Sequence, residues 1–285
     1  MNEGKIKCQI CGCASSKQIF CYKKPDKYEL SVGVKPGKGY FRKWVCCTRC
    51  GFYYSLYSRD TKILDSIYTL AYRSTASSWR KETPEERFKK IISLPAKGSE
   101  TKFRIDWIKK SISNIWKDGV LKKGKAPFKM LDIGGGSGVF AYEFRDKNWK
   151  SYVIDPNKGS IFLRKLGIPL VQESYKPGKF RYKFDLISLN YALEHMKNPE
   201  KMLKDLSGDM KKNSLLFIEV PDSLCFRHRP CGDDIFNSCH LWFFSPGSMS
   251  ILLHSCGFEI VKLCRMKTIR GHYALMLLAM KRNNR

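Results

Sequence analysis

Short apolar runs alternate with segments of helical pattern along the second half of the chain. In 199–210, for example, Met202, Leu203, Leu206 and Met210 fall on one face of a helix. The apolar runs are shorter than most core helices and have the length of strands. The strands that they predict are 129–133, 151–155, 169–172, 184–189, 215–220, 258–264 and 272–280.

Alternating strands and helices predict a mostly parallel sheet with helices on both faces. The last two strands differ, because only residues 265–271 lie between them. A parallel crossover needs a dozen or more residues, so these two strands should pair antiparallel. The pattern therefore predicts an α/β fold over 126–285, with an antiparallel last strand.

Two further regions precede this α/β domain. Apolar residues recur near helical spacing from Phe103 to Trp116, so 59–125 is predicted to be a helical connector or lid that ends in a linker at 122–127. Residues 1–58 are rich in lysine and aromatic residues, and seven of the 12 cysteines lie in the first 50 positions. This composition predicts a specialised N-terminal module.

Composition limits the class of protein. With 285 residues, 43% of them hydrophobic, the chain can bury a globular core. No apolar run reaches the ~18 residues of a membrane span, and the first residues lack the apolar stretch of a secretory signal. We therefore expect a cytoplasmic protein whose cysteines bind metal or remain thiols rather than form disulfides.

The formal net charge of the chain is +27. Such a charge favours acidic partners, such as nucleotide-linked substrates, nucleic acid or anionic lipid surfaces. The lysines are scattered rather than grouped in blocks, so a general contribution to solubility explains the charge equally well.

Candidate chemistry begins at the end of the first α/β strand. Asp132 is followed by Gly134, Gly136 and Gly138, in the order D-x-G-x-G-x-G. Glycines at such a position allow positive φ angles and let a ligand approach the main chain at the start of a helix. The dinucleotide fingerprint G-x-G-x-x-G/A does not fit, because Val139 occupies its third glycine position.

This glycine motif resembles motif I of class I S-adenosylmethionine (SAM)-dependent methyltransferases. The resemblance implies a Rossmann-like sheet and SAM as cofactor, with Asp132 near the α-ammonium group and the glycine backbone near the carboxylate. Asp155 follows Asp132 by 23 positions at the next strand end, which suits a carboxylate that binds ribose; helix capping is the alternative role. Glu173, after the third strand, is the candidate for a contact with adenine.

Three later segments carry further resemblance. Residues 184–199 and 215–222 are similar to the fourth and fifth strands of the same family, which implies that Asn190 and Tyr191 face the cofactor. The run HLWFFS at 240–245 resembles one in methyltransferases of sugar and polysaccharide pathways, which often carry an N-terminal cysteine-rich zinc domain.

Methyl transfer is an in-line displacement that depends on the position of the nucleophile. A hydroxyl or carbon nucleophile also has to lose a proton, and a histidine of near-neutral pKa suits that step. The candidate bases are His195 and His240, with Glu194 orienting a histidine or the substrate. A structural role for 193–195 is the alternative.

The N-terminal cysteines form two CxxCG knuckles, one with Cys8 and Cys11 and one with Cys47 and Cys50. Two knuckles give a closed tetrahedral site, which predicts a zinc ribbon with a structural Zn²⁺ ion. The 35 intervening residues exceed the usual spacing, but they can hold a hairpin with a long insert. Cys46 is the alternative to Cys47, although only Cys47 has CxxC spacing to Cys50.

Together these features predict a SAM-dependent methyltransferase that acts on a small-molecule or carbohydrate substrate, expected to be anionic, such as a nucleotide sugar or a glycan. An RNA methyltransferase that binds nucleic acid through its basic zinc-ribbon half is one alternative, and a catalytically silent binding module is another. Residues 190–193 do not match the Asn/Asp-Pro-Pro-Tyr/Phe motif of enzymes that methylate amino groups of bases.

Overall fold

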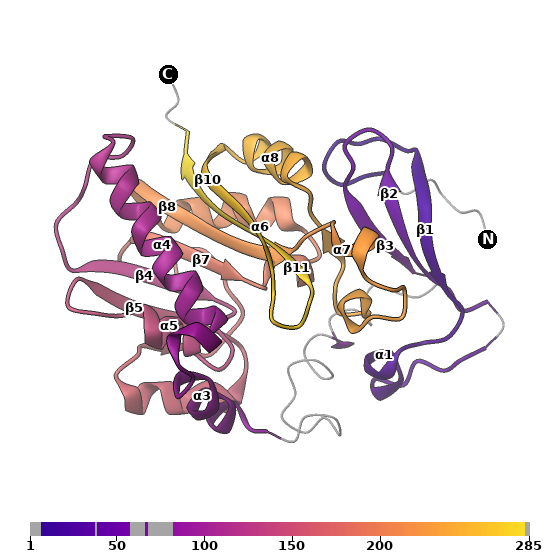
Figure 1. The fold of residues 1–285 in the computed structure, drawn as a ribbon, viewed down its shortest axis with the longest axis horizontal. Coiled ribbons are helices and arrows are strands. Elements are labelled where there is room, and N and C mark those ends of the chain that lie inside the picture. The colour runs from indigo at the N-terminus through magenta and orange to yellow at the C-terminus, as the bar shows by residue number, and fades with distance from the viewer. Residues whose placement is uncertain (1–6, 38, 58–65, 68–81, 283–285) are drawn as a thin grey trace.

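The computed structural model describes residues 7–37, 39–57, 66–67 and 82–282. A seven-stranded sheet forms the centre of its C-terminal part, in the order β10-β11-β8-β7-β4-β5-β6 (Figure 1). The strands are β4 (Phe128–Ile133), β5 (Trp149–Ile154), β6 (Leu170–Val171), β7 (Phe184–Asn190), β8 (Met210–Pro221), β10 (Phe258–Lys267) and β11 (Tyr273–Lys281).

Four strand pairs in this sheet are parallel, namely β4 with β5, β4 with β7, β5 with β6 and β7 with β8. Strand β11 runs antiparallel to both of its neighbours, β8 and β10. The predicted Rossmann-like sheet, mostly parallel with an antiparallel last strand, is therefore confirmed.

Helices cover both faces of this sheet. On one face lie α3 (Pro84–Ile92), α4 (Glu100–Lys117) and α5 (Val139–Phe144), and on the other lie α6 (Pro199–Leu206) and α8 (Pro246–Ser255) (Figure 1). Successive strand residues point to opposite faces, so each strand contributes to two apolar layers. Burial of one large aliphatic side chain in such a layer contributes about 1.5–3 kcal/mol.

The shorter helical elements lie in the connections between strands. They are η2 (Ala96–Gly98), η3 (Lys158–Leu166), η4 (Leu193–His195), η5 (Ser207–Asp209), α7 (Cys225–His228) and η6 (Asp234–Phe236). No helix in the described part of the chain is both long enough and apolar enough to cross a bilayer.

Helix α4 is the main part of the predicted connector that the structure describes. It begins at Ser99, whose side chain accepts a hydrogen bond from the backbone N–H of Lys102, a typical N-cap. Ile105, Ile108 and Ile112 recur on its buried face, as the helical spacing predicts. The rest of the predicted connector falls partly on 58–65 and 68–81, which lie outside the described residues.

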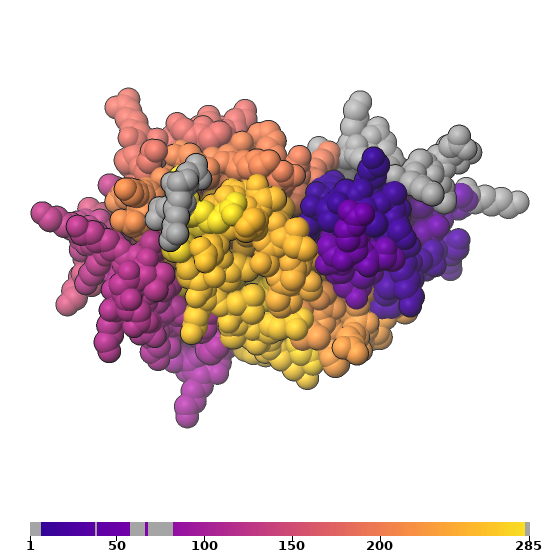
Figure 2. Space-filling model, turned by 90° about the horizontal axis from the view of Figure 1, so that it is seen from above, coloured from indigo at the N-terminus to yellow at the C-terminus, as the bar shows by residue number. Residues whose placement is uncertain are grey.

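The N-terminal module, residues 7–57, is built on a second sheet with the order β1-β2-β3-β9. Its first three strands and its helix are β1 (Ser16–Tyr22), β2 (Arg42–Cys47), β3 (Tyr53–Tyr57) and α1 (Lys27–Ser31). The fourth strand, β9 (Trp242–Phe243), belongs to the C-terminal part and pairs antiparallel with β3. The module therefore lies directly against the C-terminal part, as Figure 2 shows.

Aromatic side chains fill the contact between the N-terminal module and β9. Trp44 and Phe52 have no exposed surface. The Trp44 ring meets that of Phe243 edge-on, with centroids 5.1 Å apart, and the Phe52 ring stacks on that of Trp242 at 5.6 Å. Such pairs contribute about 0.5–1.5 kcal/mol beyond their burial.

A buried ion pair ties α4 to the sheet. The guanidinium group of Arg104 donates from Nε and Nη2 to both carboxylate oxygens of Glu219 on β8, and the Nη2–Oε1 distance is 2.6 Å. The side chains are 5% and 0% exposed. Loss of either partner would leave the other charge buried without its counter-charge.

We expect Arg104→Ala to lower the free energy of unfolding by about 3–5 kcal/mol, the usual cost of removing one partner of a buried pair. Chemical denaturation would measure it. The control is Lys110→Ala, which removes an exposed pair with Asp106 on the same helix and should cost less than about 1 kcal/mol. Equal losses in the two variants would contradict this account of the Arg104–Glu219 pair.

Candidate active site

The glycine turn between β4 and α5 has the backbone that the sequence predicts. Gly134, Gly136 and Gly138 have φ angles of 74°, 57° and 72°, in the left-handed region that favours glycine. At Gly138, a Cβ atom would also lie 2.3 Å from the side chain of Leu163. Both the conformation and the packing therefore require glycine there.

Two buried carboxylates lie beside this turn. Asp132 accepts a hydrogen bond of 2.5 Å from the Ser188 hydroxyl. Asp155 accepts from the backbone N–H groups of Gly136 and Asn157, each at 2.8 Å. Asp155 thus joins the end of β5 to the glycine turn. Asp155 has no exposed surface, so its contact with a ribose hydroxyl stays a prediction.

A cleft of about 780 Å³ opens at the carboxyl ends of the parallel strands. Its lining includes Gly134 after β4, Pro156 after β5, Ser174 after β6 and both Ala192 and His195 after β7. Ligands of open α/β sheets bind at this edge, and the volume suits a small molecule or cofactor.

The other predicted cofactor residues, Asn190, Tyr191 and Glu173, are not among the described residues that line the cleft. Tyr191 has a φ of 49°, and its ring lies 5.9 Å from the guanidinium carbon of Arg104; burial raises the pKa of its hydroxyl. Asn190 ends β7. Glu173 pairs with Lys179 at 2.8 Å and is not among the described residues that line the cleft. Its contact with adenine therefore stays a prediction.

The three predicted catalytic residues come together although 45 positions separate His195 from His240. One ligand atom of each of Glu194, His195 and His240 lies within 4.8 Å of the other two, and the imidazole centroids are 4.9 Å apart. Desolvation by burial lowers the pKa of His240 to about 4. His240 is consequently a neutral but weak base, less suited to accept a proton than the sequence suggested.

Hydrogen bonds between two loops bring these residues together. The backbone N–H of Leu241 donates to the carbonyl oxygen of Glu194 at 2.8 Å, and the Trp242 indole N–H donates to the carbonyl oxygen of Met196. Nδ1 of His195 lies 2.7 Å from the carbonyl oxygen of Cys239. The loop after β7 and the loop before β9 therefore form one polar wall, of which His195 lines the cleft.

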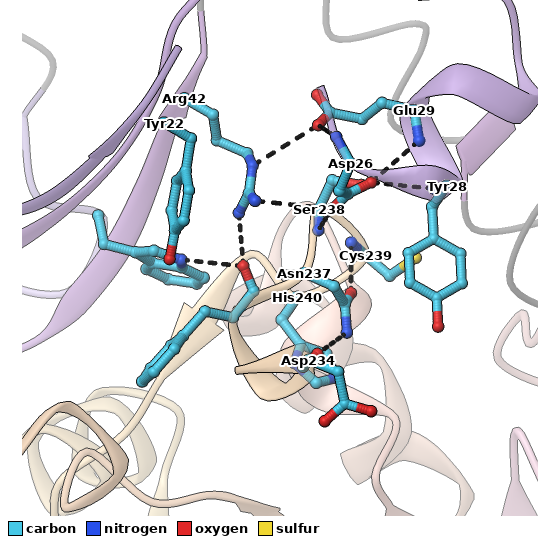
Figure 3. A network of polar contacts seen from close by, with 12 residues as sticks. Tyr22, Asp26, Tyr28, Glu29, Arg42, Asp234, Asn237, Ser238, Cys239 and His240 are labelled. Atoms are coloured by element: carbon cyan, nitrogen blue, oxygen red, sulfur yellow. Dashed lines mark hydrogen bonds and ion pairs between the residues drawn. The ribbon is translucent and has the colours of Figure 1, made fainter. Parts of the chain in front are cut away.

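The N-terminal module fixes the loop that carries His240 (Figure 3). Arg42 donates to the carbonyl oxygen of Phe236 at 2.6 Å. Asp26 accepts from the backbone N–H and the hydroxyl of Ser238, at 2.6 and 2.9 Å. Sequence reasoning missed Asp26 and Arg42, because their partners lie about 200 positions away and neither residue belongs to a local motif.

The four predicted zinc ligands also cluster. The Sγ atoms of Cys8 and Cys50 are 3.6 Å apart, those of Cys11 and Cys47 are 3.5 Å apart, and all four lie within 4.8 Å of one another. In a tetrahedral zinc site with bonds of about 2.3 Å, sulfurs are separated by roughly 3.8 Å. The donor set and its spacing fit Zn²⁺. Cys46 is not part of this cluster.

A family model described as a methyltransferase domain matches residues 104–263, more than half of the chain. The chain belongs to this family. The match confirms the predicted methyltransferase. The chain has no match among curated proteins.

Among solved structures, the methyltransferase is similar to a SAM-dependent methyltransferase from Clostridium acetobutylicum, with 12% identity and a TM-score of 0.47 over 69% of this chain and 97% of that one. It is also similar to a Burkholderia thailandensis 1,6-didemethyltoxoflavin-N1-methyltransferase, with 16% identity and a TM-score of 0.47 over 72% and 92%. A third similar structure is magnesium protoporphyrin IX methyltransferase from Synechocystis, with 13% identity and a TM-score of 0.47 over 78% of this chain and 96% of that one.

For the methyltransferase we expect Gly138→Ala to lower the free energy of unfolding by about 2 kcal/mol or more, because the new methyl group overlaps Leu163 and the left-handed φ is unfavourable for alanine. Thermal or chemical unfolding would measure the loss. Gly208→Ala is the control, since open space surrounds that position, and it should change stability by less than about 0.5 kcal/mol. Similar stability of the two variants would refute the packing argument.

Proposed function

We propose that this methyltransferase binds SAM in the cleft and transfers its methyl group to an anionic small-molecule or carbohydrate acceptor, such as a nucleotide sugar or a glycan. The observation that carries the proposal is the left-handed glycine turn of 134–138, which lies beside a cleft at the strand ends. Bare backbone in this conformation can approach the amino-acid part of SAM closely.

The carboxylates at the strand ends would orient bound SAM. Asp132, under the turn, is proposed to favour the α-ammonium group, and Asp155 the ribose hydroxyls. Ile154 and Pro156 flank Asp155 in the sequence and line the cleft. Their apolar side chains are suited to the flat face of adenine. Bound SAM supplies an electrophilic methyl group, and the chain aligns an acceptor along the S–C bond.

Positive charge near the cleft supports an anionic acceptor. Lys176 and Lys197 lie among the lining residues, as do Lys201 and Asp205, which pair with each other at 2.5 Å. Together with the net charge of +27, these lysines would attract phosphate or carboxylate groups. Glu194, His195 and His240 are proposed to form the acceptor side of the site, because His195 lines the cleft and the other two lie beside His195.

Methyl transfer from labelled SAM to two substrate panels would test the acceptor class. One panel contains nucleotide sugars and glycans, and the other contains total RNA. Methylation of a sugar panel member is expected. Incorporation only into RNA, with affinity that falls steeply with salt, would support the RNA methyltransferase instead.

Binding of the cofactor can be measured apart from turnover. We expect Asp155→Ala to weaken SAM binding at least tenfold in calorimetry, because the ribose loses an acceptor and the glycine turn loses its anchor. Asp155→Asn keeps the shape of the side chain and should show an intermediate loss. Asp118→Ala, at the exposed end of α4, is the control. Unchanged affinity in both Asp155 variants would contradict the ribose assignment.

We also propose that Cys8, Cys11, Cys47 and Cys50 bind a structural Zn²⁺ ion. Four thiolates leave no open coordination position, so this ion would stabilise the module and not take part in methyl transfer. The knuckle glycines Gly12 and Gly51 support the proposal, because each follows its second cysteine with a left-handed φ, 71° and 67°.

Adjacent cysteines provide a matched test of the zinc site. Cys47→Ser should contain one zinc ion fewer per chain than the unaltered protein and unfold at lower temperature, since metal binding contributes to folding. Cys46→Ser should keep both properties, because Cys46 lies outside the cluster. Metal analysis by mass spectrometry would measure the content. The same zinc content in all three proteins would disprove the four-cysteine site.

A further inference from the structure

The polar wall beside the cleft combines the residue types of a second metal site. Glu194, His195 and His240 are 0%, 8% and 5% exposed, and one ligand atom of each lies within 4.8 Å of the others. We propose that this cluster binds a divalent first-row transition cation. The inference rests on the proposed function in one respect only, namely that the cleft is the methyl-transfer site.

The hydrogen bonds of both imidazoles set the tautomer that a metal ligand needs. Nδ1 of His195 lies 2.7 Å from the carbonyl oxygen of Cys239, and Nδ1 of His240 lies 2.6 Å from that of Ile235. A carbonyl oxygen only accepts, so each Nδ1 carries the proton and each Nε2 carries the lone pair. Metal-binding histidines are usually oriented by such a bond from their other nitrogen.

The carboxylate of Glu194 lies beside the lone pair of His195. Nε2 of His195 is 3.6 Å from Oε1 of Glu194. Two imidazoles and one carboxylate form a ligand set that leaves open coordination positions in catalytic metal sites. Because His195 also lines the cleft, an open position would face the acceptor, where a cation can polarise a hydroxyl or carboxylate oxygen.

The charges around the cluster are compatible with a cation. Arg42 is the lysine or arginine drawn beside the loop of His240 in Figure 3, where it donates to the carbonyl oxygen of Phe236. Its guanidinium group lies 3.5 Å from the Asp26 carboxylate and 3.7 Å from that of Glu29. Two acids therefore offset this arginine, and the anionic form of Glu194 gives the cluster a net attraction for a cation.

A second cluster of acidic and histidine side chains differs from this proposed metal site. Asp233, Asp234 and His272 also place their ligand atoms within 4.8 Å. However, Arg229 pairs with Asp233 at 2.5 Å and Arg270 pairs with Asp234. The two arginines already neutralise these carboxylates, so we expect no cation there, and His272 provides a matched control.

Cobalt(II) is the probe for this site, because its visible spectrum distinguishes sulfur ligands from nitrogen and oxygen ligands. Co²⁺ is titrated into protein whose cysteines already hold zinc. We expect about one Co²⁺ per chain, bound without a thiolate-to-cobalt charge-transfer band. Glu194→Gln and His240→Gln should each weaken this binding at least tenfold, and His272→Gln should bind as the unaltered protein does.

Two further measurements separate loss of the metal site from misfolding and from loss of cofactor binding. Thermal unfolding identifies any variant that fails to fold, and Glu194→Gln preserves the size of the side chain. Calorimetry with S-adenosylhomocysteine tests the cofactor cleft separately. Absence of Co²⁺ binding, or Co²⁺ binding by the Glu194 and His240 variants that is as tight as that of the unaltered protein, would overturn the metal site while the cofactor still binds. No binding of S-adenosylhomocysteine by the unaltered protein would overturn the proposed function instead.

Discussion

The short pairing between β3 and β9 is the contact on which the arrangement of the molecule depends. Only two residues of β9, Trp242 and Phe243, pair with β3, yet their neighbours complete the site. His240 lies just before them, and Leu241 and Trp242 bond to the loop that carries Glu194 and His195. One strand thus joins the cysteine-bearing sheet to the candidate active site.

Local patterns were sufficient to predict most of the α/β domain. Strand β4 and the glycine turn follow from apolar residues, then Asp132, then glycines, and all of these signals lie within ten positions. The antiparallel pair β10 and β11 follows from the length of one loop. The knuckle spacing selected Cys47 over Cys46, and the structure clusters the same four sulfurs.

Contacts between residues far apart in the chain could not be predicted from the sequence. The two-residue strand β9 has no period to detect, and its partner β3 lies about 190 positions earlier. Arg104 is a cation on an amphipathic helix, and only the fold shows that it reaches Glu219. His240 lies beside His195, but the burial that lowers its pKa to about 4 arises only in the folded chain.

The shared strand also limits how such a protein can be recombined. If related enzymes exchanged only their cysteine-rich segments, the incoming strand would meet a β9 with the wrong aromatic partners, and the carboxylate that accepts from Ser238 would be misplaced. Exchange of the cysteine-rich segment together with the 235–243 loop would preserve both the aromatic contacts and the bond to Ser238. The unit of exchange in chimaeric enzymes is therefore discontinuous in sequence, and its borders follow contact rather than chain order.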